Sequence, residues 1–408
     1  MNPPTNPTAN PTANPTANPT ANPATPIGIP HHPVAIIGGG LGGLTLARVL
    51  QVNGIHAEVF DLDASPDART QGGMLDIHEE TGQEALRAAQ LHDAFLAKVH
   101  PGGQAMRILD QQARVRREEG DDGTGGRPEI DRGDLRGLLL DSLAPGTVRW
   151  GAKVTGARPI GGGVHEVTLA DGGVFTTGLL IGADGAWSRV RPLLSAATPA
   201  YTGISFVELD LMDAEARHPE AARLMGGGMF FALGDGKGFL GHRESDGSLH
   251  LYVALRADEE WLSTIDFTDT AAAKTALLAH FADWAPELRQ LVIDADGPLT
   301  GRPIHALPIV HRWERVPGVT LLGDAAHLMS PFAGEGANLA MKDGADLGLA
   351  LARYATDTEA ALTAYEEALF PRSEATAQES ADGLETIFDS RAPQPLLDMF
   401  AAFDAERA

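Results

Sequence analysis

The stretch Val34-Ala-Ile-Ile-Gly-Gly-Gly-Leu-Gly-Gly43 carries the strongest structural signal in this chain. Its apolar start predicts a buried strand, its glycines predict a tight turn, and the residues from about Leu41 to Val52 predict a helix. Three glycines, Gly38, Gly40 and Gly43, have the spacing G-x-G-x-x-G. In that pattern the first permits the turn, the second lets a pyrophosphate approach the backbone, and the third lets the helix pack closely on the strand.

A second predicted strand, Ala57–Asp61, ends in a carboxylate. Asp61 lies roughly 20 residues after the first glycine, at the position where an acidic side chain binds a ribose 2′-OH in this motif. The helix N-terminus would offer free N–H groups and positive potential to phosphates. Together these elements predict a site for an ADP-containing dinucleotide. The alternative is a glycine-rich turn in an ordinary α/β domain.

Composition narrows the class of protein. The 408 residues are 43% hydrophobic, which is enough for two or three domains, and the formal net charge of −24 argues against nucleic acid or an anionic membrane as a partner. There is no cysteine, so disulfides, thiolate metal sites and cysteine nucleophiles are excluded. No spacing of metal ligands is found, and we expect no metal, with a monomer or weak dimer as the assembly.

The first residues differ from the rest of the chain. Residues 2–25 are almost entirely Asn, Pro, Thr and Ala, and regularly spaced prolines oppose both helix and sheet. We therefore predict a disordered tail over residues 1–32. It lacks the pattern of a secretory signal, and no later segment is apolar enough to span a bilayer, so a cytoplasmic location is expected.

The pattern along the chain predicts an α/β fold. A Rossmann-like dinucleotide-binding domain over 33–200 and 301–360 is interrupted by a mostly antiparallel sheet over 201–300, and helices follow over 361–408. Helices are expected at about 81–97 and 129–144, and a surface loop or hairpin at 112–126. Such an insertion places a cleft between the two parts, where small molecules commonly bind.

Two further motifs are typical of an extended cofactor. The first is Gly182-Ala-Asp-Gly185, a strand end followed by Arg189 and Arg191. The second is Gly323-Asp-Ala-Ala-His327, then Ser330-Pro-Phe-Ala-Gly-Glu-Gly-Ala-Asn338 leading into a predicted helix. Asp324 is suited to accept hydrogen bonds from sugar or ribityl hydroxyls, and the helix offers a second positive N-terminus. A pyrophosphate turn combined with this element suits FAD.

These three elements, in this order, resemble the group A flavin-dependent monooxygenases, the p-hydroxybenzoate hydroxylase-like family. The similarity runs from about residue 33 to 390 and is strongest to the tetracycline-inactivating FAD monooxygenases. The supporting strings are Gly72-Gly-Met-Leu-Asp-Ile-His78, Gly82-Gln-Glu-Ala85, Pro128-Glu-Ile-Asp-Arg132, Asp134-Leu-Arg136, Gly323-Asp-Ala-Ala-His-Leu-Met329 and Pro331-Phe-Ala-Gly334.

The resemblance implies a set of cofactor contacts in addition to Gly38, Gly40, Gly43 and Asp61. They are Asp76, Arg132, Arg136, Asp324, Gly334, Glu335, Gly336 and Ala337 for FAD, Asp184 and Gly185 for both FAD and NAD(P)H, and Arg69 for the NADPH phosphate end. For several residues an alternative stays open. Arg132 and Arg136 could pair with Asp131 or Glu129, Asp76 and Asp324 could cap turns, and Arg69 could be a solvated surface residue. One departure is Leu62, where the tetracycline enzymes carry an arginine.

The resemblance also implies the reaction. NAD(P)H would reduce FAD, oxygen would add at the flavin C4a position, and the resulting hydroperoxide would hydroxylate an aromatic or polyketide-like compound. No side-chain nucleophile is required. Expected substrate contacts are Glu208, Met229, His250 and Phe332, with His250, or His242, as a candidate base; a solvent-facing histidine and a plain core phenylalanine are the alternatives. Met229 takes the place of a tetracycline-binding arginine, which favours an apolar polycyclic substrate.

Two other functions fit the same scaffold. A flavin-dependent reductase or dehydrogenase would turn over without oxygen. A non-catalytic flavoprotein that sequesters a drug would bind its ligand without stimulating NAD(P)H oxidation.

Overall fold

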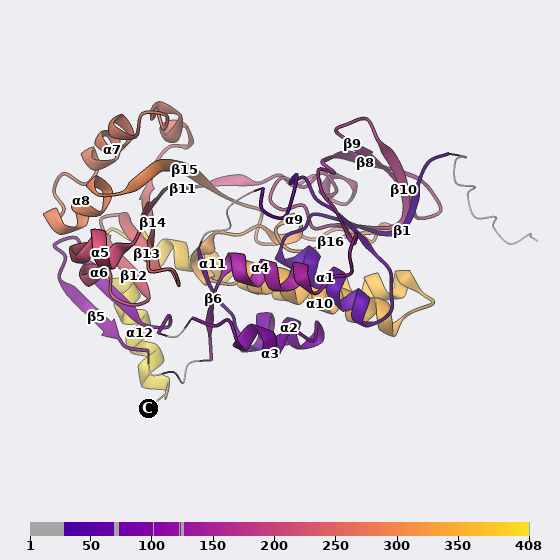
Figure 1. Cartoon of the computed structure of the whole chain (residues 1–408), viewed down its shortest axis with the longest axis horizontal. Helices are drawn as coiled ribbons and strands as arrows, with labels where there is room; N and C mark the ends of the chain where they lie inside the picture. The colour runs from indigo at the N-terminus through magenta and orange to yellow at the C-terminus, as the bar shows by residue number, and fades with distance from the viewer. Residues whose placement is uncertain (1–27, 69–72, 101, 122, 124–125, 408) are drawn as a thin grey trace, which may run out of the picture.

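The computed structural model describes residues 28–68, 73–100, 102–121, 123 and 126–407. Two large sheets organise them (Figure 1). The first sheet has the strand order β7-β2-β1-β10-β9-β8, with β16 beside β10. Its strands are β1 (His31–Ile37), β2 (Glu58–Phe60), β7 (Val148–Arg149), β8 (Val154–Gly161), β9 (Val164–Leu169), β10 (Val174–Gly182) and β16 (Val319–Leu321).

The parallel part of this sheet determines where the cofactor elements meet. Strands β7, β2, β1, β10 and β16 run parallel, so their carboxyl ends lie along one edge. Gly38, Asp61, Asp184 and Asp324 each follow one of these ends. Helices α1 (Leu41–Val52) and α10 (Gly336–Arg353) pack against each other beside that edge. The predicted first strand and helix are therefore present.

The second sheet has the order β15-β11-β14-β13-β12-β4-β5. Its strands are β4 (Met106–Asp110), β5 (Val115–Glu119), β11 (Ala200–Leu211), β12 (Met229–Gly234), β13 (Lys237–Arg243), β14 (Leu249–Arg256) and β15 (Asp296–Ala306). All neighbours are antiparallel except β4 and β12. This confirms the predicted mostly antiparallel sheet, although the sheet is larger than residues 201–300. Strands β4 and β5 extend it as an antiparallel pair, and β5 lies within the segment 112–126 that was expected to be a surface loop or hairpin.

The second sheet buries both of its faces. One face packs on α5 (Ala214–Arg217), α6 (Pro219–Met225), α7 (Thr270–Ala279) and α8 (Pro286–Ile293), with Phe230, Phe239 and Leu251 in the shared core. The other face, called here the inner face, packs with Phe206 and Leu233 against the end of α11 (Thr358–Ile387) and against α12 (Gln394–Arg407). Alternation along each strand gives residues of opposite parity to the two faces.

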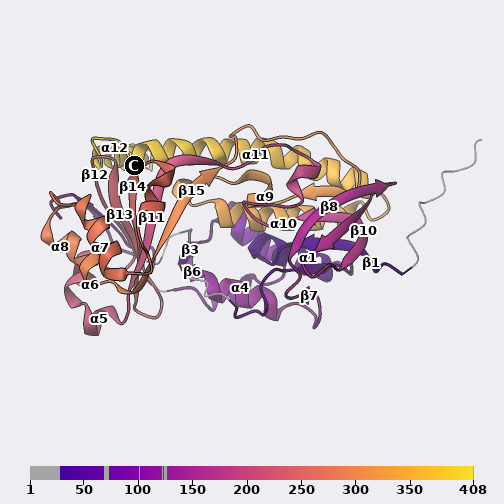
Figure 2. The same cartoon turned by 90° about the horizontal axis from the view of Figure 1, so that it is seen from above.

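Helix α11 joins the two halves. Figure 2 shows it running along the molecule from the first sheet to the second. Its first turns contribute Leu362 and Leu369 to the core of the first sheet, and its last turns contribute Leu384 and Ile387 to the core on the inner face. The edge of the first sheet formed by the carboxyl ends of its parallel strands is called here the cofactor edge. Helix α11 therefore connects this cofactor edge to the inner face.

Three local expectations differ from the structure. Residues 81–97 do not form one helix, because the left-handed Gln90 (φ 57°) separates α2 (Glu84–Ala88) from α3 (His92–Leu96), and a π-helix, η1 (Glu79–Gln83), precedes them. The predicted helix 129–144 begins instead as strand β6 (Glu129–Asp131), which pairs with β3 (Met74–Asp76), before α4 (Arg132–Asp141). Here backbone pairing with a distant strand overrides local helical propensity.

The expected tail boundary also shifts. Residues 1–27 lie outside the described residues, but β1 already begins at His31, so His31 and His32 belong to the first sheet. Short elements complete the fold: η2 (Arg191–Leu193), η3 (Glu259–Thr264), α9 (Asp324–His327) and η4 (Pro331–Ala333). Within the described ranges, no helix has both the length and the apolar character needed to cross a bilayer.

Candidate functional site

The three glycines of the G-x-G-x-x-G turn have different surroundings. A Cβ on Gly38 (φ +110°) would lie 2.2 Å from the carbonyl oxygen of Ala183, and one on Gly43 would lie 2.1 Å from that of Gly38. A Cβ on Gly40 would meet nothing within 4 Å. Gly38 and Gly43 are therefore required by packing, whereas Gly40 leaves open space in front of α1. That helix has no side-chain cap and no acidic residue in its first turn, so its free N–H groups suit a pyrophosphate.

Asp61 supports the turn from the neighbouring strand. Its carboxylate accepts hydrogen bonds from the backbone N–H of Gly39 (2.6 Å) and of Asp63 (2.8 Å). The side chain is buried, and it lies beside the first turn of α1, as expected for an acid that binds a ribose. The next residue, Leu62, is 62% exposed, so the surface where an arginine was expected is apolar and open.

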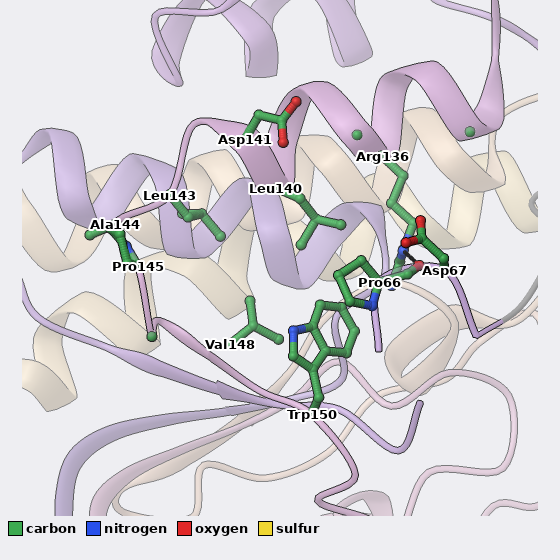
Figure 3. A pocket seen from close by; sticks show the side chains of 13 residues that line it. Pro66, Asp67, Arg136, Leu140, Asp141, Leu143, Ala144, Pro145, Val148 and Trp150 are labelled. Atoms are coloured by element: carbon green, nitrogen blue, oxygen red, sulfur yellow. Dashed lines mark hydrogen bonds between the residues drawn. The ribbon is translucent and has the colours of Figure 1, made fainter. Parts of the chain in front are cut away.

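Arg136 lies in a pocket of about 570 Å³ between α4 and β7 (Figure 3). Its guanidinium donates to the carbonyl oxygen of Pro66 (2.9 Å), lies 3.9 Å from Asp63 and sits 5.5 Å from the ring centre of Trp150. These contacts answer the open alternative for Arg136: it pairs with neither Asp131 nor Glu129 but holds the segment that follows Asp61. Its predicted contact with FAD stays a prediction.

Arg132 and Asp324 carry free polar groups. Among the described residues, neither the guanidinium of Arg132 nor the carboxylate of Asp324 has a hydrogen bond or ion pair. Asp324 as a whole residue is exposed, yet the protein around its carboxyl group desolvates it and raises its pKa, against the charges of His327 and Arg132. Two uncommitted groups of opposite charge on separate elements fit a polar chain such as a ribityl-pyrophosphate. The alternative pairing of Arg132 is not present.

Asp184 is committed to its own turn. One carboxylate oxygen accepts from Ser188 Oγ (2.5 Å) and the other from the backbone N–H of Arg189 (2.6 Å). Gly185 (φ +76°) occupies the left-handed region that makes this turn possible. Burial raises the pKa of Asp184, which those two hydrogen bonds oppose. The predicted cofactor role of Asp184 therefore depends on this loop rather than on a free carboxylate.

The loop Gly334–Ala337 leads into α10 and faces β3. Gly334 is left-handed (φ +69°), and a Cβ there would lie 3.6 Å from the carboxylate of Asp76. A Cβ on Gly336 would meet nothing within 4 Å. Asp76 and Glu335 each direct an oxygen at the ring of His78, and their predicted contacts with FAD stay predictions. The alternative that Asp76 only caps a turn does not describe its contact, because its carboxylate pairs with His78. The sequence motif did not predict this pairing.

The predicted substrate residues come together on the inner face. Strand register aligns His242, His250 and Asp210 across β13, β14 and β11, and Met229 begins the next strand, β12, one residue before the Phe230–Gly241 pair. Residues aligned in this way are direct cross-strand neighbours. Glu208 lies in the adjacent row, opposite Tyr252. Phe332, from η4, packs edge-on against Phe206 of the same face (centroids 5.9 Å apart) and against Phe388 of α11 (5.2 Å).

His250 is surrounded by carboxylates. Its Nδ1 lies 2.6 Å from Asp210 Oδ1, and its Nε2 lies 3.8 Å from Glu208 Oε1. Burial alone would lower the pKa of His250, but the hydrogen bond to Asp210 and the charges of Asp210, Glu244 and Glu208 raise it. These carboxylates stabilise the protonated imidazolium of His250 relative to the neutral ring. This favours a cationic donor over the general base that the sequence suggested.

Three residues on or beside the inner face, Tyr252, Glu129 and Glu244, were not among the predicted substrate contacts. The charge of Arg132 acts to lower the pKa of Tyr252, and the Tyr252 hydroxyl lies 3.9 Å from a Cβ placed on Gly73. Tyr252 therefore lies where the inner face approaches the segments that carry the predicted cofactor residues. Burial raises its pKa to about 12. Glu129 pairs with His242 (2.5 Å). Burial raises the pKa of Glu244 to about 7, against the charges of His250 and His242. Alternation on β13 and β14 was the available signal.

The remaining predictions concern Arg69 and metals. Arg69 lies outside the described residues, so its predicted NADPH contact stays a prediction. In the part of the chain that the structure describes, no group of three or more His, Asp or Glu residues is placed to hold a metal ion.

Residues 31–380 match the family model described as "FAD binding domain". The chain belongs to this family. Its members bind FAD, in agreement with the free Arg132 and Asp324 groups and the open turn at Gly40. The predicted resemblance to group A flavin monooxygenases and the predicted α/β fold with an inserted sheet are confirmed.

Relatives of this FAD binding domain protein are monooxygenases. It is 31% identical over 398 residues to "Monooxygenase penA" of Penicillium thymicola, covering 83% of this chain and 91% of that protein. It is also 31% identical over 355 residues to "FAD-dependent urate hydroxylase" of Klebsiella pneumoniae (81% of this chain, 84% of that one). The chain is therefore an FAD-dependent monooxygenase, an oxidoreductase, as predicted.

Solved structures support the fold. HpxO of Klebsiella pneumoniae, complexed with FAD and uric acid, gives a TM-score of 0.75 at 23% identity, covering 91% of this chain and 92% of that one. The tetracycline destructase Tet(55) gives a TM-score of 0.71 at 19% identity, covering 91% and 94%. At these identities the likeness concerns the fold alone, so the predicted tetracycline-type substrate does not follow from it.

Proposed function

We propose that this monooxygenase uses NAD(P)H and O2 to hydroxylate an electron-rich aromatic or polycyclic small molecule held between the inner face and the flavin. The observation that carries the proposal is the alignment of His242, His250 and Asp210 on one face of the second sheet, with Met229 at the start of the next strand. Tyr252 on the same face couples electrostatically to Arg132 of the cofactor edge. When bound, FAD supplies the redox and oxygen-transfer chemistry.

The inner face favours a substrate that is both apolar and ionisable. Met229 lies beside Met106 in register, and Leu240 and Phe231 belong to the same apolar cluster, so one end of the row offers adaptable apolar contact. His250 lies farther along the row, on β14, with its Nε2 buried and without a hydrogen-bond partner among the described residues. A phenol or enol would place its oxygen at such a donor and its rings on the methionines.

The charge on His250 has a chemical consequence. A cationic donor stabilises a phenolate relative to the phenol, and the phenolate is the more electron-rich form. His250 would therefore lower the pKa of a bound phenol without itself removing the proton. Phe332 would close the pocket wall beside the flavin loop, and apolar surroundings exclude water from the reacting centre.

Related proteins act on molecules of this kind. The names of relatives and structural neighbours specify urate, 3-amino-4-hydroxybenzoate and 2,6-dihydroxypyridine, each an electron-rich ring bearing ionisable groups. A tetracycline is a less direct fit, because Met229 cannot form the charged, forked hydrogen bonds of an arginine.

The decisive experiment follows NADPH and NADH oxidation together with oxygen uptake across a panel of urate, aminohydroxybenzoates, phenols and tetracyclines. Mass spectrometry under 18O2 then tests for one labelled oxygen atom in the product. The proposal requires a compound that accelerates NAD(P)H oxidation and gains one 18O. Turnover of such a compound in the absence of oxygen would favour the reductase alternative, and tight binding without acceleration would favour the sequestering flavoprotein.

A further inference from the structure

A buried histidine connects the flavin loop to strand β3. The side chain of His78 is 4% exposed, and each of its ring nitrogens contacts a carboxylate. Nε2 lies 2.7 Å from Asp76 Oδ2, and Nδ1 is hydrogen-bonded to Glu335 Oε1. Asp76 and Glu335 are more than two hundred residues apart in the sequence, so the imidazole joins two distant segments.

Further hydrogen bonds fix the same junction. Asn338, in the first turn of α10, accepts from the backbone N–H of His78 (3.0 Å) and donates to the carbonyl oxygens of Asp76 (2.8 Å) and Gly334 (3.3 Å). Thr81 Oγ1 donates to the second oxygen of Glu335 (3.4 Å). The orientation of the imidazole is therefore set by groups from β3, η1 and α10.

Two acceptors at two ring nitrogens require two N–H donors. Only the imidazolium form carries both, whereas a neutral ring would leave one nitrogen facing a carboxylate lone pair. The charged groups around His78 are Asp76 on β3, Glu335 before α10 and Arg127, which lies 3.8 Å from Asp76. Burial would lower the pKa of His78, but the hydrogen bonds and charges of the two carboxylates raise it to about 9.

We propose that His78 is a positioning residue for the flavin, holding the loop Gly334–Ala337 on β3 and neutralising the two carboxylates beside it. Without that charge, Asp76 and Glu335 would place two negative groups next to the N-terminus of α10. The positive potential of that terminus, which suits the anionic end of a reduced flavin, would then be cancelled. This role depends on FAD binding at the loop, not on the identity of the substrate.

The sign of the pH dependence follows from the direction of the shift. The pKa of His78 in the folded protein is raised from its usual 6.5 to about 9, so the folded protein keeps this proton at neutral pH and loses it as pH rises through about 9. FAD affinity should therefore be constant between pH 6.5 and 8 and fall above pH 9. A loop held by neutral hydrogen bonds alone would show no such fall.

The test measures FAD binding rather than turnover. Apoprotein is titrated with FAD by flavin fluorescence between pH 6.5 and 10, for the wild type, His78→Gln and Glu335→Gln. The wild type should lose roughly tenfold in affinity between pH 8 and 10. His78→Gln should bind about tenfold more weakly at pH 7 and lose the pH dependence. Glu335→Gln should keep it with a midpoint at lower pH, because one carboxylate no longer stabilises the imidazolium.

A second readout is the midpoint potential of the bound flavin, which should become more negative in His78→Gln. The matched control is His32→Gln. His32 also pairs with a carboxylate, that of Glu58 (2.6 Å), but it lies at the start of β1, away from the glycine turn that follows the strand. This variant should leave both readouts unchanged. If His78→Gln fails to fold, the wild-type profile and the Glu335→Gln midpoint still decide. Wild-type affinity that is flat to pH 10, or an unshifted midpoint in Glu335→Gln, would overturn the proposal.

Discussion

The cofactor edge and the inner face of the second sheet use different chemistry. At the edge, backbone groups dominate: open space at Gly40, a helix N-terminus and left-handed turns at Gly185 and Gly334. On the inner face, titratable side chains such as His250 and Glu244 dominate. An invariant ligand part such as a pyrophosphate suits backbone recognition, whereas a particular substrate requires side chains. The comparison predicts that substitutions in the two regions separate FAD binding from substrate response.

The largest effect is expected within the glycine turn. Gly43→Ala places a methyl group against the carbonyl of Gly38 and should destabilise the apoprotein by roughly 3 kcal/mol, as overpacking against backbone does. Gly40→Ala meets no protein atom and should leave the apoprotein Tm unchanged while weakening FAD binding about tenfold or more. Calorimetry of the apoprotein and FAD titration distinguish the two. Equal stability of the two variants would contradict this division.

The next effect concerns the uncommitted charges. Arg132→Met or Asp324→Asn should weaken FAD binding by about 10- to 100-fold, since charge-assisted hydrogen bonds contribute roughly 1.5–3 kcal/mol. The apoprotein Tm should hardly change, because neither group has a partner among the described residues. Arg136→Met is the contrast: it removes the bond to Pro66 and should lower the apoprotein Tm. If Arg132→Met lowered the Tm and left FAD binding intact, Arg132 would be a structural residue and not a contact of FAD.

On the inner face, His250→Gln should spare FAD binding. It removes the cationic donor, so the KM for a compound that stimulates NADPH oxidation should rise about tenfold, and more hydrogen peroxide should escape per NADPH consumed. Steady-state kinetics with a peroxide assay measures both. Unchanged KM and unchanged peroxide yield, with the same compound, would remove His250 from the substrate site.

A smaller effect concerns stability against pH. Burial raises the pKa of Glu244 to about 7, so the folded protein binds this proton more tightly than the unfolded chain does. Stability should therefore fall as pH rises from the usual carboxyl pKa through about 7. Glu244→Gln should raise the Tm by roughly 1–2 °C at pH 8 and leave it unchanged at pH 5. A stabilisation of equal size at both pH values would point to packing instead.

The smallest effect is expected at Leu62, which is exposed beside the ribose-binding acid. Leu62→Arg supplies a cation there and should tighten FAD binding about two- to fivefold, because an exposed cation–π or ion contact contributes roughly 0.5–1 kcal/mol. The gain should shrink at high salt. A gain that is independent of salt would indicate an apolar or structural cause.

The same contrast explains which features the sequence predicts. Gly38, Gly43 and the strands around them follow a local spacing, so the turn, α1 and β2 could be located from residue order alone. The clamp on His78 could not, because Glu335 lies far away in sequence and only the fold brings it to the ring. The helix expected over 129–144 begins later than predicted for a related reason: Glu129–Asp131 form strand β6 because β3 lies beside them, and α4 starts only at Arg132.

The inner face shows an intermediate case. Alternation on β14 places His250 and Tyr252 on one side, and this can be read from the sequence. Their protonation cannot, because the pKa of His250 depends on Asp210 and Glu208 of the neighbouring strand. The sequence therefore indicates the position of His250 on this face, whereas the carboxylates that act on its pKa become visible only in the fold.

An FAD titration of the apoprotein, combined with the absorption spectrum of the purified protein, would show directly whether this chain forms an FAD site. We expect a yellow protein with flavin bands, an apoprotein that binds one FAD per chain, and weaker FAD binding in Gly40→Ala with the fold intact. A colourless protein that remains free of FAD when the cofactor is supplied in excess would contradict it.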